Sequence, residues 1–232
     1  MVSDTRLPTV QPESSVPSRT GSEWWPDPSA RVPRVVRITG NLIGAAGAGY
    51  FSYVTLEAFL RTHRPIGFLF FAEQMVVVVA YLARRPAHTV TARLGDWLLA
   101  FGGTFLPVLL RPDGAHPQWG LQWGLVLQFC GVVVCLWSFF ALGRSFGFAA
   151  ADRGLVQRGP YRVVRHPIYV SYVLLQIGYL LQSFSLRNLA VVLLAIACNA
   201  GRIRAEERVL AANPAHAAYC RLVRWRVVPG LW

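Results

Sequence analysis

Residues 119–142 read WGLQWGLVLQFCGVVVCLWSFFAL, an apolar stretch without a single charged side chain. A bilayer has a hydrocarbon core of ~30 Å, which about 20 helical residues cross at ~1.5 Å each. The stretch is therefore long enough to span a membrane as a helix with room to tilt. It predicts a helical membrane protein.

Other apolar segments surround this one, separated by short polar connections. The first is also long enough to tilt, and the others are shorter but adequate spans. Almost nothing separates the last two, so they are expected to form a tight helical hairpin, or else one broken hydrophobic element. The predicted fold is all-α, a polytopic transmembrane bundle of about six spans with a C-terminal helical hairpin. The further segments are 35–60, 66–83, 94–111, 168–184 and 186–203.

The composition also favours a membrane protein. Of the 232 residues, 54% are hydrophobic and 15% are charged, whereas a soluble domain carries roughly 25% charged residues. The formal charge is +12, and all 23 basic residues are arginine. A nucleic-acid-binding protein would need these arginines on one soluble face. Here they lie between apolar blocks, so the predicted partner is the lipid bilayer and not a nucleic acid.

The arginines also predict an orientation. With six spans, 19 of the 23 arginines fall on the side that holds both termini, the 84–93 loop and the 143–167 loop. Because positive charge is enriched in cytoplasmic loops, both termini are expected in the cytoplasm. The all-arginine, Ala/Val/Leu-rich composition is associated with bacteria, so a bacterial inner membrane is expected. Residues 1–33 are polar and rich in Pro and Ser, and a disordered tail is expected there.

The stretch 159–169, GPYRVVRHPIY, carries the first candidate site. Pro167 lacks a backbone N–H and suits the first position of a helix, so a helix is expected to begin there. His166 would then cap the helix, with Arg165 just outside it and Tyr169 one turn in. The N-terminal end of a helix carries partial positive charge and free N–H groups. The sequence therefore predicts a pocket suited to a carboxylate, with aromatic rings beside it.

The second candidate cluster, RIRAEER at 202–208, follows the sixth apolar segment. Helical spacing puts Arg202 and Glu206 on one face. In a hairpin the two clusters would face each other at the cytoplasmic surface. A carboxylate at the centre of a membrane helix costs on the order of 2.5–3.5 kcal/mol, so Glu206 and Glu207 indicate a function or well-placed partners. The plainer alternatives are a helix cap for His166, a membrane anchor for Arg165 and ion pairs for the glutamates.

Together these residues resemble a known family. The pattern Gly-Pro-Tyr-x-x-x-Arg-His-Pro-x-Tyr is followed by Arg-x-x-x-Glu-Glu-x-x-Leu, by Tyr219 and by Val-Pro-Gly at 228–230. In this order and spacing they resemble the isoprenylcysteine carboxyl methyltransferase family, to which bacterial homologues and the phospholipid methyltransferases are related. The resemblance covers roughly residues 140–232. The family usually has a glycine where this chain has Ser171. Serine is still small, so close helix packing is expected to survive, and the departure concerns the shape of the lipid entry.

The resemblance implies methyl transfer from S-adenosyl-L-methionine, bound from the cytoplasm, to a lipophilic acceptor such as an isoprenoid, a prenylcysteine-like molecule, a prenylated protein or a lipid. It implies catalytic roles for Arg165 and Glu206 and a substrate-side role for Arg202. The chain then divides into a tail (1–33), four membrane helices (34–142) and a catalytic half (143–232). The residues implied in cofactor binding are Leu155, Val156, Tyr161, His166, Pro167, Ile168, Tyr169 and Glu206.

Two other functions stay open at this stage. One is a membrane reductase of the sterol-reductase type, which has an Arg-His-x-x-Tyr element and uses NADPH. The other is a non-enzymatic membrane protein. No metal site is predicted, because the cysteines and histidines lack the spacing of metal ligands. Glu57, Glu73 and Asp96 lie in or near apolar segments and are left without a role.

Overall fold

The computed structural model describes residues 34–63, 65–85, 87, 89–111 and 118–232. The tail predicted at 1–33 lies outside the described residues. The described chain is mostly helical, which confirms the all-α prediction, and every predicted apolar segment forms a helix. The helices are α1 (Arg34–Thr62), α2 (Pro65–Ala83), α3 (Leu94–Phe105), α4 (Gln118–Leu142), α5 (Pro167–Gln182), α6 (Leu186–Leu210) and α7 (Pro214–Leu222).

Short elements connect these helices. Three 3₁₀ turns lie at Leu106–Leu109, Gly143–Ser145 and Gly159–Arg162. The first continues α3, because Pro107 has no N–H for the α-helical pattern. Two short strands, β1 (Thr89–Val90) and β2 (Ala151–Asp152), pair antiparallel.

Two stretches among the described residues are long and apolar enough to cross a membrane. They are Gln118–Ser145 and Leu186–Leu210, and Gly67–Ala83 and Leu94–Leu109 are shorter apolar helices. Length and composition thus indicate membrane association. Six spans remain a prediction.

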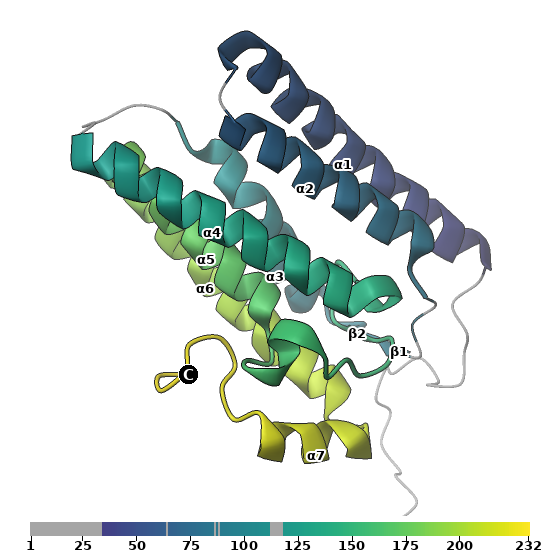
Figure 1. Ribbon diagram of the computed structural model, residues 1–232. Helices are drawn as coiled ribbons and strands as arrows, with labels where there is room; N and C mark the ends of the chain where they lie inside the picture. The colour runs from purple at the N-terminus through teal and green to yellow at the C-terminus, as the bar shows by residue number, and fades with distance from the viewer. Residues whose placement is uncertain (1–33, 64, 86, 88, 112–117) are drawn as a thin grey trace, which may run out of the picture.

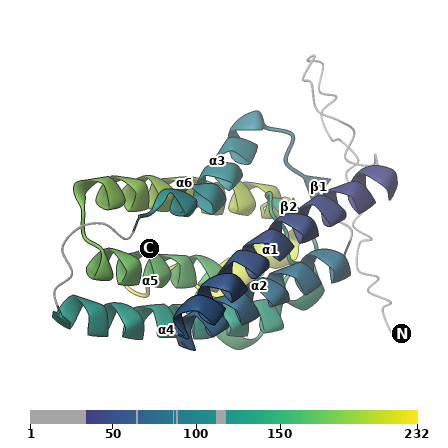
Figure 2. The same ribbon diagram turned by 90° about the horizontal axis from the view of Figure 1, so that it is seen from above.

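The long helices pack in pairs. Helices α1 and α2 lie side by side, as do α4 and α5, while α6 packs mainly against α3 (Figures 1 and 2). Helices α4 and α5 approach closely, because a Cβ atom on Gly124 would lie 2.5 Å from the Gly178 carbonyl oxygen. The expected tight hairpin of α5 and α6 is not confirmed: the two helices are consecutive, but α5 packs chiefly against α4.

The loops and the C-terminal segment that carry most of the arginines lie together at one end of the bundle. The β1–β2 pair joins the loop after α2 to the loop after α4. The Arg84 side chain donates to Asn41 near the start of α1. The backbone N–H groups of Arg165 and His166 donate to carbonyls of the C-terminal segment, at Trp225 and Arg226. These connections therefore lie at one end of the molecule, which holds the candidate site.

Candidate active site

The start of α5 positions the first candidate residues. Helix α5 begins at Pro167, and His166 occupies the N-cap position, as the sequence predicts. The His166 N–H donates to the Arg226 carbonyl at 2.8 Å, and the Arg165 N–H donates to Trp225 at 2.9 Å. The C-terminal segment therefore holds the backbone just before α5 in place.

Glu206, near the end of α6, meets the start of α5. The Tyr169 hydroxyl donates to Oε1 of Glu206. Oε2 of the same carboxylate lies 3.5 Å from Nδ1 of His166. The predicted encounter between the two clusters is thus present, and both carboxylate oxygens face the first turn of α5.

Glu207 is held by two arginines. Its Oε1 lies 2.8 Å from Nη1 of Arg165, and its Oε2 accepts from Nε of Arg226 at 2.7 Å. Arg165 also contacts the Cys220 thiol and the Arg224 carbonyl. Glu207 therefore ties the end of α6 to the segment before α5 and to the C-terminal segment. The ion-pair alternative fits Glu207 better than Glu206.

His166 is buried between the two carboxylates. Burial lowers its pKa, but the contacts with Glu206 and Glu207 outweigh that effect and leave the pKa above its ordinary value of 6.5. Its Nε2 lies 3.5 Å from Oε1 of Glu207 and makes no hydrogen bond among the described residues. The imidazole can therefore carry a proton beside Glu206.

A small cavity of about 140 Å³ lies at this meeting point. Most of the predicted cofactor residues line it. Pro167 does not line the cavity and is fully buried, so it acts through the helix start. The predicted residues around the cavity are Leu155, Val156, Tyr161, Arg165, His166, Ile168, Tyr169, Arg202 and Glu206.

Tyr161 and Tyr219 are buried and line this cavity. The Tyr219 hydroxyl donates to the backbone carbonyl of Tyr161 at 2.6 Å. Burial raises the pKa of Tyr219 to about 12, and burial also raises the pKa of Tyr161 well above its ordinary value. Both phenols therefore stay neutral. Helix α7 carries Tyr219 and so contributes a side chain to the wall of the cavity.

Arg202 is buried, and its guanidinium is hydrogen-bonded within the chain. Its guanidinium donates to Thr104, to Asn199 and to the Phe148 carbonyl, the last at 2.9 Å. It also lies 5.4 Å from the centre of the Tyr169 ring, within the range of a cation–π contact. The predicted substrate-side arginine is therefore held rigidly at the edge of the site.

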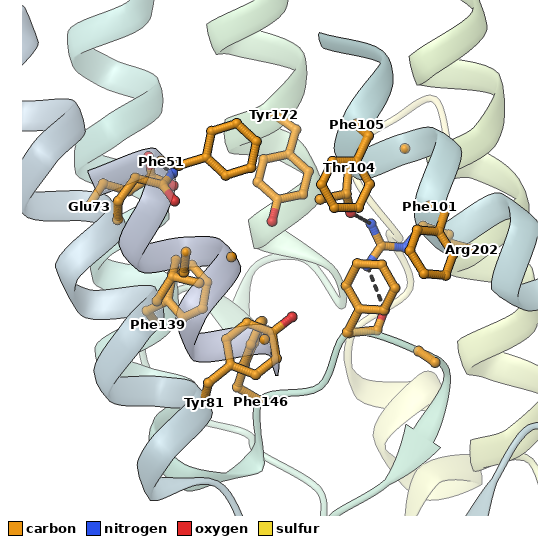
Figure 3. A pocket seen from close by; sticks show the side chains of 18 of the residues that line it. Phe51, Glu73, Tyr81, Phe101, Thr104, Phe105, Phe139, Phe146, Tyr172 and Arg202 are labelled. Atoms are coloured by element: carbon orange, nitrogen blue, oxygen red, sulfur yellow. Dashed lines mark hydrogen bonds between the residues drawn. The ribbon is translucent and has the colours of Figure 1, made fainter. Parts of the chain in front are cut away.

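A much larger cavity of about 1870 Å³ adjoins the small one. Aromatic side chains from several helices ring it, and the Tyr172 side chain projects into it between Glu73 and Arg202 (Figure 3). The two cavities are adjacent, because they share a set of lining residues. These are Phe146, Ala149, Arg153, Gly154, Tyr172 and Arg202.

Arg153 is a site residue that the sequence does not reveal. It lines both cavities, and its buried Nε has no hydrogen-bond partner among the described residues. Burial, with the nearby charge of Arg84, lowers its pKa to about 10. A Cβ atom on Gly147 would lie 2.0 Å from its Nη1, so the glycine makes room for this side chain. Nothing in the local sequence marks Arg153 among the other loop arginines.

The three acids left without a role differ in their surroundings. Glu57 pairs with Arg61 at 2.5 Å on the surface of α1. Asp96 accepts from Thr91 at 2.5 Å and lies 3.1 Å from Arg208, which links α3 to α6. Glu73 lines the large cavity. Only the last of the three is placed to contact a ligand.

Comparison with known proteins supports the resemblance. A family model described as phospholipid methyltransferase matches residues 119–213. The search of curated proteins found no match. The matched region runs from α4 to just beyond α6, so it includes the predicted cofactor residues and leaves out α7 and the C-terminal segment. The match confirms the resemblance to the family of the isoprenylcysteine carboxyl methyltransferase-like proteins over residues 119–213.

Proposed function

We propose that this protein is an integral-membrane, S-adenosyl-L-methionine-dependent methyltransferase that acts on a lipophilic acceptor. The family implies a membrane methyltransferase. The observation that carries the proposal is the contact of Glu206 with Tyr169 and His166 beside a small cavity that adjoins a large aromatic one.

The small cavity has the chemistry to hold the methyl donor. The donor has an amino group and ribose hydroxyls, which suit the Glu206 carboxylate, and a carboxylate, which suits an arginine. Buried polar atoms are normally hydrogen-bonded. Three residues that line the cavity each carry a buried nitrogen without a hydrogen-bond partner among the described residues, namely Arg153 Nε, Arg165 Nε and His166 Nε2. These groups fit a polar, zwitterionic ligand.

The size of the small cavity adds one requirement. Its volume of about 140 Å³ is below the roughly 300–1,000 Å³ of small-molecule sites. A ligand of nucleoside size must therefore displace a side chain or extend toward the large cavity. Arg153 lines both spaces, and its Nε has no hydrogen-bond partner among the described residues. We infer that it moves when the donor binds.

When bound, the donor supplies a methyl group on a positively charged sulfur. Transfer depends on position, because donor and acceptor must be aligned. Glu206 and His166 orient the donor side. Tyr172 and Arg202 lie where the two cavities meet and orient the acceptor. The aromatic rings around them exclude water from the reacting atoms.

The large cavity favours a lipophilic acceptor with an acidic group. Its wall is rich in aromatic and aliphatic side chains, and its charged lining residues are mostly arginines. Acidic groups are attracted to such a potential, so a carboxylate or phosphate is expected near Arg84 and Arg153. The charged lining residues are Arg84, Arg85, Arg153, Arg202 and Glu73.

Labelled S-adenosyl-L-methionine tests the proposal. Purified protein in nanodiscs is offered farnesyl-cysteine analogues and a bacterial lipid extract, and the organic phase is analysed for label. We expect label in a lipophilic product, and its loss in the Glu206→Gln variant. No transfer to any lipophilic compound, with the protein folded, would refute the activity. We also expect both termini in the cytoplasm, which cysteine labelling in intact cells checks.

A further inference from the structure

The wall of the large cavity carries buried polar side chains that the donor site does not use. Glu73 on α2 is 5% exposed, and Gln128 on α4 and Gln176 on α5 are each 6% exposed. All three line the large cavity and not the small one. Gln128 accepts a hydrogen bond from Gln182 at 2.9 Å. Glu73 and Gln176 are less well paired, and burying polar groups without good partners costs free energy.

Gln176 has an unused acceptor. Its Oε1 is buried and makes no hydrogen bond among the described residues. Gln176 lies four residues after Tyr172, so the two share one face of α5, and that face lines the cavity. A buried amide oxygen is normally paired. Because Gln176 lines the cavity, a donor bound there can supply the missing partner once the amide turns toward it.

Glu73, on α2, makes only weak hydrogen bonds among the described residues. Its Oε1 contacts the Cys135 thiol and its Oε2 accepts from Gln74, each at 3.3 Å. A thiol is a weak donor, and the bond from Gln74 is longer than the usual range for N–H···O hydrogen bonds. In the described part of the chain, no arginine lies at ion-pair distance from Glu73. The carboxyl group thus retains capacity for a further partner.

The charge of the cavity decides which kind of donor fits. Four arginines line the cavity against Glu73 as the single acid among its lining residues. The resulting positive potential disfavours a cationic ligand such as an ammonium. A neutral donor meets the needs of Gln176 and Glu73 without this repulsion.

We propose that Glu73 and Gln176 form a subsite for a neutral hydrogen-bond donor, a hydroxyl or amide N–H, carried part-way along the lipophilic acceptor. The proposal rests on the proposed function only in identifying the large cavity as the acceptor cavity. It adds that the acceptor is not a plain hydrocarbon tail. The subsite selects acceptors by a polar group away from the end that receives the methyl group.

Binding of two matched fatty acids tests the subsite without any methyl transfer. Octadecanoate and 12-hydroxyoctadecanoate share an anionic end for the arginines and differ only in a mid-chain hydroxyl. Calorimetry on the full chain in nanodiscs gives both Kd values. We expect the hydroxylated probe to bind roughly three- to tenfold more tightly, as one additional hydrogen bond implies. Octadecylamine is expected to bind more weakly than either acid.

Variants assign the preference to the two residues. Gln176→Met keeps the side-chain length and removes the acceptor, so the two acids should bind equally. Glu73→Met should do the same, which gives a second test if one variant fails to fold. Gln122→Met is the matched control, because Gln122 is exposed on α4 and does not line the cavity. It should keep the full preference.

Several results would overturn the subsite. They are equal binding of the two acids by the wild type, a preference that survives in Gln176→Met, or tighter binding of octadecylamine. S-adenosylhomocysteine binding, measured in parallel, keeps the two proposals apart. If it binds and the hydroxyl preference is absent, the subsite alone fails. If it does not bind and the preference is present, the methyl-donor assignment alone fails.

Discussion

The Tyr169 hydroxyl donates a hydrogen bond to Glu206 and thereby joins the first turn of α5 to the last turns of α6. The two residues lie 37 positions apart in the sequence. Because both line the small cavity, this bond fixes the geometry on which the donor site depends. The consequences can be tested one residue at a time.

The adjacent glutamates are expected to differ in role. Glu206→Gln should weaken S-adenosylhomocysteine binding by roughly ten- to hundredfold, because charge-assisted hydrogen bonds contribute about 1.5–3 kcal/mol. Glu207→Gln breaks ion pairs with Arg165 and Arg226 and should cost about 1–3 kcal/mol of stability. Equilibrium dialysis and thermal unfolding measure the two effects. If both variants weakened binding equally and lowered stability equally, the assignment of ligand binding to Glu206 and of stability to Glu207 would be contradicted.

His166 should make stability depend on pH. Its folded pKa lies above the unfolded value of 6.5, so the protonated form stabilises the fold. That contribution is fully present below pH 6.5 and is lost as the pH rises through the higher folded pKa. The Tm of the wild type should therefore fall as the pH rises above 6.5. His166→Gln should flatten the profile, and an unchanged slope in that variant would exclude His166 as the source.

Arg202 should act on the acceptor more than on the donor. It is held by Thr104, Asn199 and the Phe148 carbonyl where the two cavities meet. Arg202→Gln should raise the acceptor KM by about tenfold or more, since the loss of a charged hydrogen bond costs about 1.5–3 kcal/mol. Arg204→Gln is the control, because Arg204 lies over the Trp232 ring and lines neither cavity. Steady-state kinetics with the acceptor found in the labelling experiment would separate the two variants, and equal effects would contradict the assignment.

The close approach of α4 and α5 should be sensitive to one methyl group. A Cβ atom on Gly178 would lie 2.7 Å from the Gly124 carbonyl oxygen, and backbone cannot yield easily. Gly178→Ala should therefore cost about 1–3 kcal/mol. Gly49→Ala on α1 meets no heavy atom within 4 Å and should be neutral or stabilising by roughly 0.5–1 kcal/mol. Thermal unfolding of both variants checks this, and similar Tm values would count against the packing.

The sequence predicts the helices and the centre of the site well, because both follow from local chemistry. Long apolar runs require helices, and Pro167 marks the start of α5. The meeting of His166 with Glu206 follows from two polar clusters at the ends of consecutive helices. In these cases, residues close in the chain carry the information.

The remaining features depend on tertiary packing that no local pattern reports. Helix α5 packs chiefly against α4, and the local signal among the described residues is a set of glycines at 124, 131 and 178 that lie close to the partner helix. The C-terminal segment holds the backbone of Arg165 and His166 through main-chain bonds that any sequence can make. Arg153 becomes a site residue only because its loop folds back between the two cavities.

The assignment of the small cavity to a sulfonium nucleoside is the central claim, and calorimetry with S-adenosylhomocysteine and NADPH tests it most directly. Purified protein in nanodiscs is titrated with each ligand, and the Glu206→Gln variant is titrated in parallel. We expect one saturable site for S-adenosylhomocysteine, weakened by the substitution, and no binding of NADPH. Saturable binding of NADPH with none of S-adenosylhomocysteine would contradict the account.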